Sequence, residues 1–335
     1  MPILDPGDYT IVWIAPLEIE ARAARCMLDN EHQGKFPLSR GDDYLFLPGD
    51  MCGHNIVIAT LPAGQVYGTA SAAALASRIK SFFPNLWFAL LIGVAAGLPN
   101  RSRDIRLGDV LVALPTNDSE AIVPYDLGKE TTGGYELLRE GTHLKGVPAV
   151  VGSAIRHIKM KSSKRTPAFL RHYRKMKNIE HTDGATFVDP GQDKDVLWGS
   201  ETTRIRRRAR RPEARTRVWY GALGSGDKLI KDAHKRDLLQ QLSRDGLIGL
   251  EMEAAGTMNQ LPVGVIKGVC DYADANKNDV WQPYAAAIAS AYAKELLKEV
   301  GPGTPLRRRL PRATSTPDYH TVSTQDSRPR PTCTS

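Results

Sequence analysis

The chain alternates short apolar runs of strand length with helix-forming segments, from residue 9 to residue 300. Residues 87–92 form a fully apolar run, and residues 263–270 form a mostly apolar run that is rich in β-branched residues. Such runs, separated by helices, indicate strands of a parallel sheet. We therefore expect an α/β fold, in which a central mixed, largely parallel twisted sheet is flanked by helices in a single domain.

The pattern also predicts where the domain begins and ends. Residues 1–8 read as a short N-terminal arm and residues 9–300 as the domain, with a variable insert region at 117–217. Residues 301–335 consist largely of Pro, Ser, Thr and Arg, with few apolar residues. That composition cannot bury a core, so we expect a disordered basic tail.

Individual elements follow from the same reading. Pro16 stands at a favourable first-turn position and starts a helix whose first turn holds Glu18 and Glu20. Further helices are expected at 68–83, 228–244 and 282–300, further strands at 9–15, 44–48, 54–61 and 218–223, and a turn plus strand at 106–113.

Composition narrows the functional classes. Hydrophobic residues make up 41% and charged residues 24% of the 335 residues, which is typical of a soluble globular protein. The four cysteines have no CxxC spacing, which favours reduced thiols in a cytoplasmic protein over a disulfide framework or a metal site. We find no signal peptide and no apolar run of the roughly 18 residues that a membrane span needs.

The net charge of +8 is concentrated in two runs. Residues 204–217 hold eight arginines and one glutamate, and residues 307–312 hold four arginines. Such runs bind phosphates or nucleic acid, or are solvated loops and tails. We expect solvated segments. Nucleic acid is an unlikely partner, because the tail lacks interleaved aromatic residues apart from Tyr319.

Residues 249–274 place two carboxylates on consecutive elements. Glu251 opens a helix-forming run that includes Glu253, and Pro262 interrupts it. Asp271 directly follows the strand at 263–270, and ligands of open α/β sheets bind at the carboxyl ends of strands. An alternative interpretation is that Asp271 caps the next helix and that Glu253 is a solvated helix residue.

Seven pieces of the sequence, in this order, resemble the superfamily of purine nucleoside phosphorylases and 5'-methylthioadenosine nucleosidases. The resemblance is greatest to the branch of filamentous fungi, where such domains often stand at the N-terminus of receptor-like proteins. The pieces are IAPLE (14–18), LPAGQVYGTASAAA (61–74), IGVAAGLP (92–99), VPYDLGK (123–129), YGALGSGDKLIKDA (220–233), GLEMEAAGTMN (249–259) and GVCDYADANKNDVWQPYAAA (268–287).

The resemblance implies roles for residues at matching positions. Glu18 matches the glutamate that activates the attacking water, with Glu20 as the alternative if the alignment slips. Glu253 matches the glutamate that holds the ribose hydroxyls, Met252 the methionine that packs on the sugar, and Asp271 the aspartate that protonates or hydrogen-bonds N7 of the purine.

Further positions complete the implied substrate site. Gly93, Ala95 and Ala96 match the glycine-rich loop beside the nucleophile. Leu229 and Ile230 fall where the family packs side chains on the base. Ser225, in the piece YGALGSGDK, is also expected to bind substrate.

The chemistry agrees with these residue types. Cleavage of an N-ribosidic bond builds negative charge on the purine, and a positioned acid that neutralises it contributes roughly 10²–10⁴-fold to the rate. A raised pKa suits that acid, and the apolar neighbours Val269 and Tyr272 are expected to supply it by desolvation. Two further carboxylates would fix the sugar and accept a proton from water.

The acceptor is predicted to be water. Phosphorylases of the superfamily commonly carry an arginine and a serine as phosphate ligands where this chain has Leu91 and Val94. We therefore expect a hydrolase acting on adenosine-type nucleosides, or on ATP if residues 204–217 grip a triphosphate. A phosphorylase and a catalytically silent sensor module are the alternatives. No cofactor and no metal are expected, and the resemblance implies a homo-oligomer.

Overall fold

The computed structural model describes residues 2–116, 119–132, 134–137, 144–161, 167–179, 186–199, 203–205, 207–243 and 245–302. The described residues belong to one compact unit. Apart from Gly301 and Pro302, the tail expected at 301–335 lies outside the described residues. No helix within the described ranges combines the length and the apolar character needed to cross a membrane.

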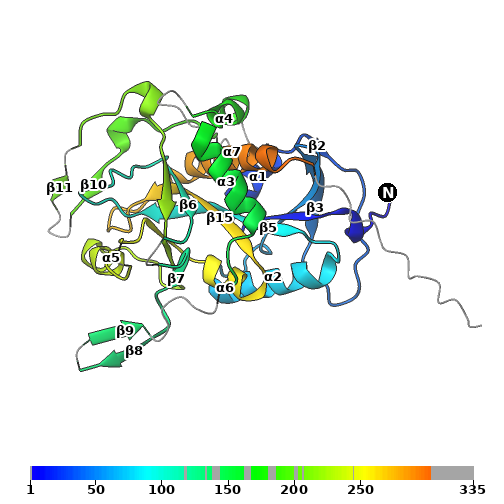
Figure 1. Ribbon diagram of the computed structural model, residues 1–335, viewed down its shortest axis with the longest axis horizontal. Helices are drawn as coiled ribbons and strands as arrows, with labels where there is room; N and C mark the ends of the chain where they lie inside the picture. Colours follow the sequence, from blue (N-terminus) through cyan, green and yellow to red (C-terminus); the bar gives the residue numbers. More distant parts are fainter. Residues whose placement is uncertain are drawn as a thin grey trace, which may run out of the picture. The chain divides into compact units, whose positions relative to one another are not determined.

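A central sheet of eleven strands runs through this unit (Figure 1). The order of its main path is β12 (Val218–Gly221), β6 (Val110–Ala113), β15 (Val263–Asp271), β5 (Phe88–Gly97), β1 (Ile11–Ile14), β4 (His54–Ala59), β3 (Phe46–Met51) and β2 (Asn30–Glu31). The strands β7 (Ile122–Pro124), β13 (Leu223–Ser225) and β14 (Gly249–Glu251) branch from β5. Two small hairpin sheets pair β8 (Gly128–Thr131) with β9 (Gly134–Leu137) and β10 (Leu197–Trp198) with β11 (Arg204–Ile205).

The centre of the sheet is parallel and its borders are mixed. Strands β4, β1, β5 and β15 pair in parallel, whereas β15 pairs antiparallel with β6 and β4 pairs antiparallel with β3. All residues of β1 and β15 are buried, as expected for strands that are covered on both faces. The predicted α/β fold with a mixed, largely parallel sheet is confirmed.

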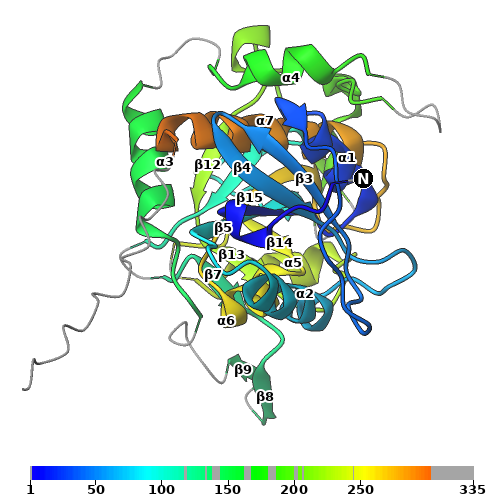
Figure 2. The same cartoon turned by 90° about the vertical axis from the view of Figure 1, so that its right-hand side faces the viewer.

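Helices cover both faces of the sheet (Figures 1 and 2). The helix α7 (Gln282–Val300) packs on β15 and β5, and α1 (Glu18–Arg25), α3 (Ala149–Lys161) and α4 (Leu170–Met176) pack against α7. On the opposite face α2 (Thr69–Phe82) packs against α6 (Ala254–Gln260). The remaining helices are α5 (Ala233–Gln240) and the 3-10 helices η1 (Pro6–Asp8), η2 (Gln192–Lys194) and η3 (Pro212–Ala214).

Glycine permits the closest of these contacts. A Cβ at Gly268 would lie 2.0 Å from the carbonyl oxygen of Ala285, so only glycine lets α7 lie this close to β15. A Cβ at Gly256 would lie 1.8 Å from the carbonyl oxygen of Thr69, where α6 meets α2.

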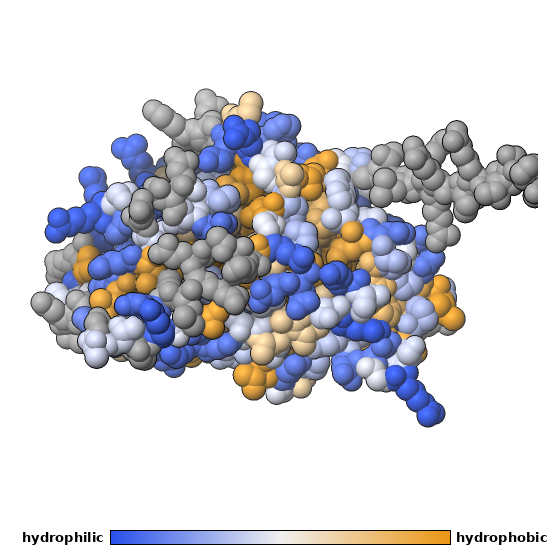
Figure 3. Space-filling view, turned by 60° about the horizontal axis from the view of Figure 1, so that its bottom comes forward, coloured by the Kyte–Doolittle hydropathy of each residue, from blue (hydrophilic) through white to orange (hydrophobic). Residues whose placement is uncertain are grey.

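The surface on the side of α2 and α6, seen in Figure 3, carries hydrophobic side chains in small groups among hydrophilic ones.

Several predicted elements have different bounds in the structure, among them the strand expected at 44–48, which is Phe46–Met51. The strand expected at 87–92 continues to Gly97, because β15 and β14 pair with the glycine-rich piece that follows. The helix expected from Glu251 begins only at Ala254, since Gly249–Glu251 is a buried strand. The helix expected at 228–244 begins at Ala233, where Asp232 caps it by accepting from the backbone N–H of His234.

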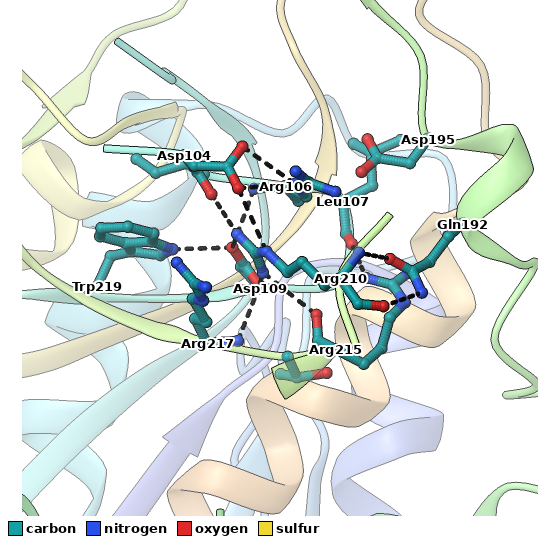
Figure 4. Close-up of polar contacts among 12 residues, drawn as sticks. Asp104, Arg106, Leu107, Asp109, Gln192, Asp195, Arg210, Arg215, Arg217 and Trp219 are labelled. Atoms are coloured by element: carbon teal, nitrogen blue, oxygen red, sulfur yellow. Dashed lines mark hydrogen bonds and ion pairs between the residues drawn. The ribbon is translucent and has the colours of Figure 1, made fainter. Parts of the chain in front are cut away.

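The expectation of a solvated arginine run at 204–217 is wrong for three of its arginines. Arg210 and Arg215 are buried, and Arg207 is partly buried. Arg210 forms a bidentate pair with the fully buried Asp109, at 2.6 Å from Nη1 to Oδ1 and 3.0 Å from Nη2 to Oδ2 (Figure 4). Arg215 pairs with Asp189 at 3.1 Å, and Arg207 pairs with Asp195 at 2.8 Å.

The Asp109 carboxylate is the centre of this arginine cluster. Besides Arg210, it accepts hydrogen bonds from Trp219 Nε1 and from the backbone N–H groups of Arg106 and Arg217 (Figure 4). The segment is therefore held to the domain by buried, charge-assisted bonds. Composition alone does not predict these bonds, because the acids that pair with the arginines lie on other elements.

Candidate active site

The topology brings three strand ends to one edge of the sheet. β1, β5 and β15 are adjacent and parallel, so their carboxyl ends meet there. Asp271, the last residue of β15, lies beside Ala96 of β5, after a bulge that follows Val269. The α1 helix with Glu20 follows the end of β1, and this edge is where α/β sheets bind ligands.

The strand β14 approaches the same edge of the sheet. It crosses β5 antiparallel, pairing Gly249 with Gly97 and Leu250 with Ala96, so the chain from Glu251 to Glu253 enters the same edge. Glu253 is the N-cap residue of α6 and is buried. It is not the solvated helix residue that the alternative interpretation described.

A cavity of about 450 Å³ lies where these segments meet. It is lined by Leu17, Glu20, Tyr67, Val94, Ala95, Ala96, Tyr125, Lys228, Leu229, Ile230, Lys231, Leu250, Glu251, Met252, Glu253, Cys270, Asp271, Ala273, Lys277, Asn278, Asp279 and Gln282. Seven of the expected site residues are therefore brought together, namely Ala95, Ala96, Leu229, Ile230, Met252, Glu253 and Asp271, and Glu20, the alternative to Glu18, lies with them.

Glu18, the predicted water-activating residue, is not part of this cavity. Its side chain is 79% exposed and pairs with Arg22 one helical turn later, at 2.6 Å. Glu20, two residues on, is buried and lines the cavity. Residues two apart on a helix point in different directions, so only one of the two can face the sheet edge. The structure places Glu20 there, the alternative position in the sequence reading.

The Glu20 carboxylate is fixed by two backbone donors. Oε2 accepts from the N–H of Leu17 at 2.8 Å, which closes the first turn of α1, and Oε1 accepts from the N–H of Val94 at 2.8 Å. A Cβ at Gly93 would lie 2.0 Å from Oε1, so Gly93 makes room for Glu20. Gly93 thus shapes the site from behind and does not line the cavity.

Ser225 also lies behind the cavity. Its hydroxyl oxygen accepts from the backbone N–H of Ala255 at 2.9 Å, at the start of α6. It lines a second cavity, of about 480 Å³, between α2 and α6. The expectation that Ser225 contacts substrate is therefore not met by the geometry, and the residue instead supports the helix that Glu253 caps.

A buried lysine that the sequence analysis missed joins the carboxylates. The Lys267 side chain has no exposed surface, and its Nζ lies 3.0 Å from Glu253 Oε2 and 3.4 Å from Glu251 Oε2. Glu251 in turn accepts from the backbone N–H groups of Glu253 and Ala254. The signal was present in the sequence, because Lys267 is a charged residue in the middle of a buried strand, where lysine needs a partner.

The acidic cluster, as we name Glu20, Glu251, Glu253 and Lys267, holds three carboxylates and one ammonium group. Burial raises the pKa of Glu20 to about 7, and the Glu253 carboxylate adds to the rise while Lys267 opposes it. Burial also raises the pKa of Glu251. For Lys267 burial acts to lower the pKa, but the three carboxylates outweigh it and the pKa is raised. Lys267 therefore stays charged, and Glu20 exchanges its proton near neutral pH.

Asp271, the last residue of β15, also lines the cavity. Its Oδ1 accepts from the backbone N–H of Ala273 at 2.8 Å, and its Oδ2 lies 3.0 Å from Nζ of Lys277 and 3.2 Å from the Cys270 thiol. The side chain of Asp271 is 3% exposed. Lys277 was not anticipated, because the sequence analysis considered only the apolar neighbours of Asp271.

The outer wall of the cavity is the segment that leads into α5. Its residues Lys228, Leu229, Ile230 and Lys231 line the cavity, and Leu229 is 43% exposed. Tyr125 anchors this wall by donating from its hydroxyl to the carbonyl oxygen of Lys228 at 2.9 Å. Within the described ranges no cluster of His, Cys, Asp and Glu side chains has the arrangement of a metal site.

Comparison with solved structures identifies the fold. The chain matches a 5'-methylthioadenosine/S-adenosylhomocysteine nucleosidase from Neisseria meningitidis with a TM-score of 0.56 and 17% identity, over 86% of this chain and 98% of that one. It matches futalosine hydrolase from Helicobacter pylori with a TM-score of 0.57 and 14% identity, over 87% and 98%. At these identities the likeness concerns the fold.

Sequence comparison gives a partial match. No family model matches the chain. A nucleotide-binding leucine-rich repeat (NLR)-like protein of Hyaloscypha variabilis is 35% identical over 312 residues, covering 90% of this chain and 30% of the relative. The chain thus spans about a third of the length of that relative. Its fold is that of nucleosidases, with a carboxylate-lined cavity at the edge where the parallel strands end.

Proposed function

We propose that the chain is a purine nucleosidase, which hydrolyses the N-ribosidic bond of an adenosine-type nucleoside to the free base and the sugar. One observation carries the proposal: Glu20, Glu253 and Asp271, which are far apart in the sequence, line the same cavity. The nucleosidase fold of the structural neighbours supports it.

In this proposal each acid has a separate task. Glu253, held by Lys267, accepts hydrogen bonds from the ribose hydroxyls and fixes the sugar. Met252 packs on the sugar, and Leu229 and Ile230 pack on the base. Asp271 acts on N7 of the purine. Glu20, with a pKa near neutrality, accepts a proton from the attacking water.

Charge favours water over phosphate as the acceptor. The backbone N–H of Val94 already donates to Glu20, so this donor is not free for an anion. The acidic cluster has more carboxylates than ammonium groups, and a phosphate dianion beside it would be repelled. Lys267, the ammonium group near Glu20, already pairs with Glu251 and Glu253, so it is not free to bind the phosphate that the phosphorylase alternative needs.

Product analysis tests this proposal. Adenosine incubated with the chain, with and without inorganic phosphate, should yield adenine and ribose at the same rate in both samples. The Asp271→Asn variant should lose roughly 10²–10⁴-fold in kcat, because it removes the acid. Ribose 1-phosphate formed only with phosphate would establish the phosphorylase instead. Absence of any activity towards adenosine, inosine and ATP would favour the silent sensor module.

A nucleotide is the second candidate substrate. Lys228 and Lys231 are exposed and line the cavity, where ammonium groups could bind phosphates. The described residues of the arginine run 204–217 do not line the cavity. The residues proposed to bind a triphosphate are therefore these two lysines and not that run. If ATP is a substrate, the double variant Lys228→Met/Lys231→Met should raise KM for ATP by roughly 10–100-fold and leave KM for adenosine within about twofold.

Three further expectations belong to this proposal. A homo-oligomer, a cytoplasmic location and descent from the fungal receptor-associated branch fit the resemblance, and the match to a fungal NLR-like protein agrees with the last of them. Light scattering of the purified chain tests the oligomer. A mass equal to one chain would contradict it.

A further inference from the structure

The turn between β15 and α7 places Lys277 beside Asp271. Ala273 has a φ of +53°, a left-handed conformation that is rare for alanine, and it is buried. This conformation lets its N–H donate to Asp271 Oδ1. Asp274 then accepts from the N–H of Asn276 at 2.9 Å, and its carbonyl oxygen accepts from the N–H of Lys277 at 3.2 Å.

The returned lysine pairs with Asp271 inside the cavity. Nζ of Lys277 lies 3.0 Å from Asp271 Oδ2, and the two side chains are 18% and 3% exposed. Both residues line the cavity. Burial acts to lower the pKa of Lys277, but the Asp271 carboxylate and the Cys270 thiol outweigh it, and the pKa is raised. Lys277 is therefore an ammonium group at neutral pH.

The two groups of charged residues at the cavity differ in composition. The acidic cluster holds three carboxyl groups and one ammonium group, which suits a sugar that becomes cationic. The group at Asp271 includes the Lys277 ammonium, which suits a base that becomes anionic. This separation of charge follows the direction in which electrons move when the N-ribosidic bond breaks.

We propose that Lys277 is a positioning residue on the leaving-base side of this cavity, which acts through its pairing with Asp271. The inference rests on the proposed nucleosidase function. The bond between the sugar carbon and the purine nitrogen breaks, and its electron pair moves to the base. The Lys277 ammonium gives its proton, through the Asp271 carboxyl group, to N7 of that base.

The remaining steps balance the reaction. The oxygen of water bonds to the sugar carbon, and a proton of this water moves to Glu20. Solvent then returns a proton to Lys277 and takes one from Glu20. In total, one nucleoside and one water become one neutral purine and one sugar. Lys277 thus acts only on leaving groups that need a proton.

Two leaving groups separate this role from a structural one. Adenosine needs a proton on its departing base, whereas the departing group of p-nitrophenyl β-D-riboside is stable as an anion. In the full 335-residue chain, Lys277→Met should lower kcat for adenosine by about 100-fold, since general acid catalysis contributes roughly that much or more. The same variant should change kcat for the nitrophenyl riboside less than about threefold, because that step needs no acid.

Two further variants complete the design. Lys277→Arg keeps the positive charge and the pairing with Asp271 but cannot give up a proton, so its kcat for adenosine should fall about as far as that of Lys277→Met. Lys80→Met changes an exposed lysine on α2 outside the cavity and should leave both rates unchanged. Thermal unfolding of each variant shows whether a loss of activity is due to a loss of folding. If Lys277→Met does not fold, the two substrates are compared with Lys277→Arg instead.

The outcomes separate this inference from the proposed function. Equal loss of both activities in Lys277→Met, or no loss with adenosine, overturns the role of Lys277 and leaves the nucleosidase intact. A wild-type chain that cleaves adenosine but not the nitrophenyl riboside is tested with the N7-methylated nucleoside, whose base also departs without a proton. A wild-type chain that cleaves none of them overturns both proposals.

Discussion

Two buried groups of charged residues in this molecule both combine acidic and basic side chains. They differ in whether each acid has a basic partner of its own. In the arginine cluster Asp109 is enclosed by Arg210, Trp219 and backbone donors, and none of these residues lines the cavity (Figure 4). In the acidic cluster Lys267 pairs with Glu251 and Glu253 and interacts electrostatically with Glu20, and three of the four residues line the cavity. A balanced, closed cluster holds structure together, whereas an unbalanced, open one has charge available for a substrate.

The cost of burial makes this comparison informative. Removing one partner of a buried ion pair costs roughly 3–5 kcal/mol, because it leaves the other charge unpaired. Either cluster should therefore affect folding when it is broken. Only the acidic cluster should affect catalysis in the protein that remains folded. The four predictions below test that difference, from the largest expected effect to the smallest.

The largest effect is expected from the acid that faces the cavity. Glu20→Gln should lower kcat by roughly 10²–10⁴-fold, because it removes the proposed base. Glu18→Gln, on the same helix, should leave kcat within about twofold, since its side chain is an exposed surface group. Steady-state kinetics with adenosine measure both. A larger loss from Glu18→Gln than from Glu20→Gln would return the catalytic role to Glu18.

Replacing the central cation of each cluster by methionine compares the two clusters directly. Lys267→Met and Arg210→Met should each lower the free energy of unfolding by about 3–5 kcal/mol, measured by urea denaturation, because each leaves buried carboxylates without their cation. Lys267→Met should also raise KM for adenosine at least about tenfold, since Glu253 loses the Nζ that holds it. Arg210→Met should leave KM within about twofold in the folded protein. Equal effects on KM would remove the distinction.

The pH dependence of stability tests the burial of Glu20. Its folded-state pKa is about 7, above the ordinary value of 4.5, so the folded chain binds this proton more tightly than the unfolded chain. The stabilisation is complete below pH 4.5 and is lost as the pH rises through about 7. Glutamine does not titrate, so the free energy of unfolding of Glu20→Gln relative to wild type should increase with pH, by at most about 3 kcal/mol.

Denaturation curves at several pH values check the sign of this effect. A constant difference between Glu20→Gln and wild type from pH 5 to pH 8 would mean that Glu20 titrates normally. In the wild type, kcat should rise as the pH passes about 7, because the base must be ionised. Activity that falls over this range would contradict the proposed role.

The smallest effect is expected from a surface pair. Glu18 and Arg22 form an i,i+4 pair on α1, with side chains that are 79% and 27% exposed. Glu18→Gln should change the free energy of unfolding by less than about 0.5 kcal/mol, because solvent screens such pairs. A thermal or urea denaturation measurement that gives a loss above 1 kcal/mol, on the scale of roughly 0–1 kcal/mol for surface pairs, would show that the charge acts beyond its own helix.

Local patterns in the sequence determined the elements of the fold. The β-branched run at 263–270 and the alanine-rich stretch at 282–300 correspond to β15 and α7, since burial on both faces leaves a continuous apolar signal. Asp271 could be located at the end of a strand by the same reasoning. The ordered motifs indicated the nucleosidase fold, and they indicated Glu253, Met252 and the residues around Ala95 as neighbours.

Only the tertiary structure decided which charges meet. Glu20 rather than Glu18 faces the cavity because the N–H of Val94, on another element, binds its carboxylate. Lys267 and Lys277 join the site because β14 and the turn after β15 return to the same edge. The buried Arg210 pairs with Asp109, which lies 101 residues away in the sequence. Pairing over such distances depends on the sheet order, which no local pattern encodes.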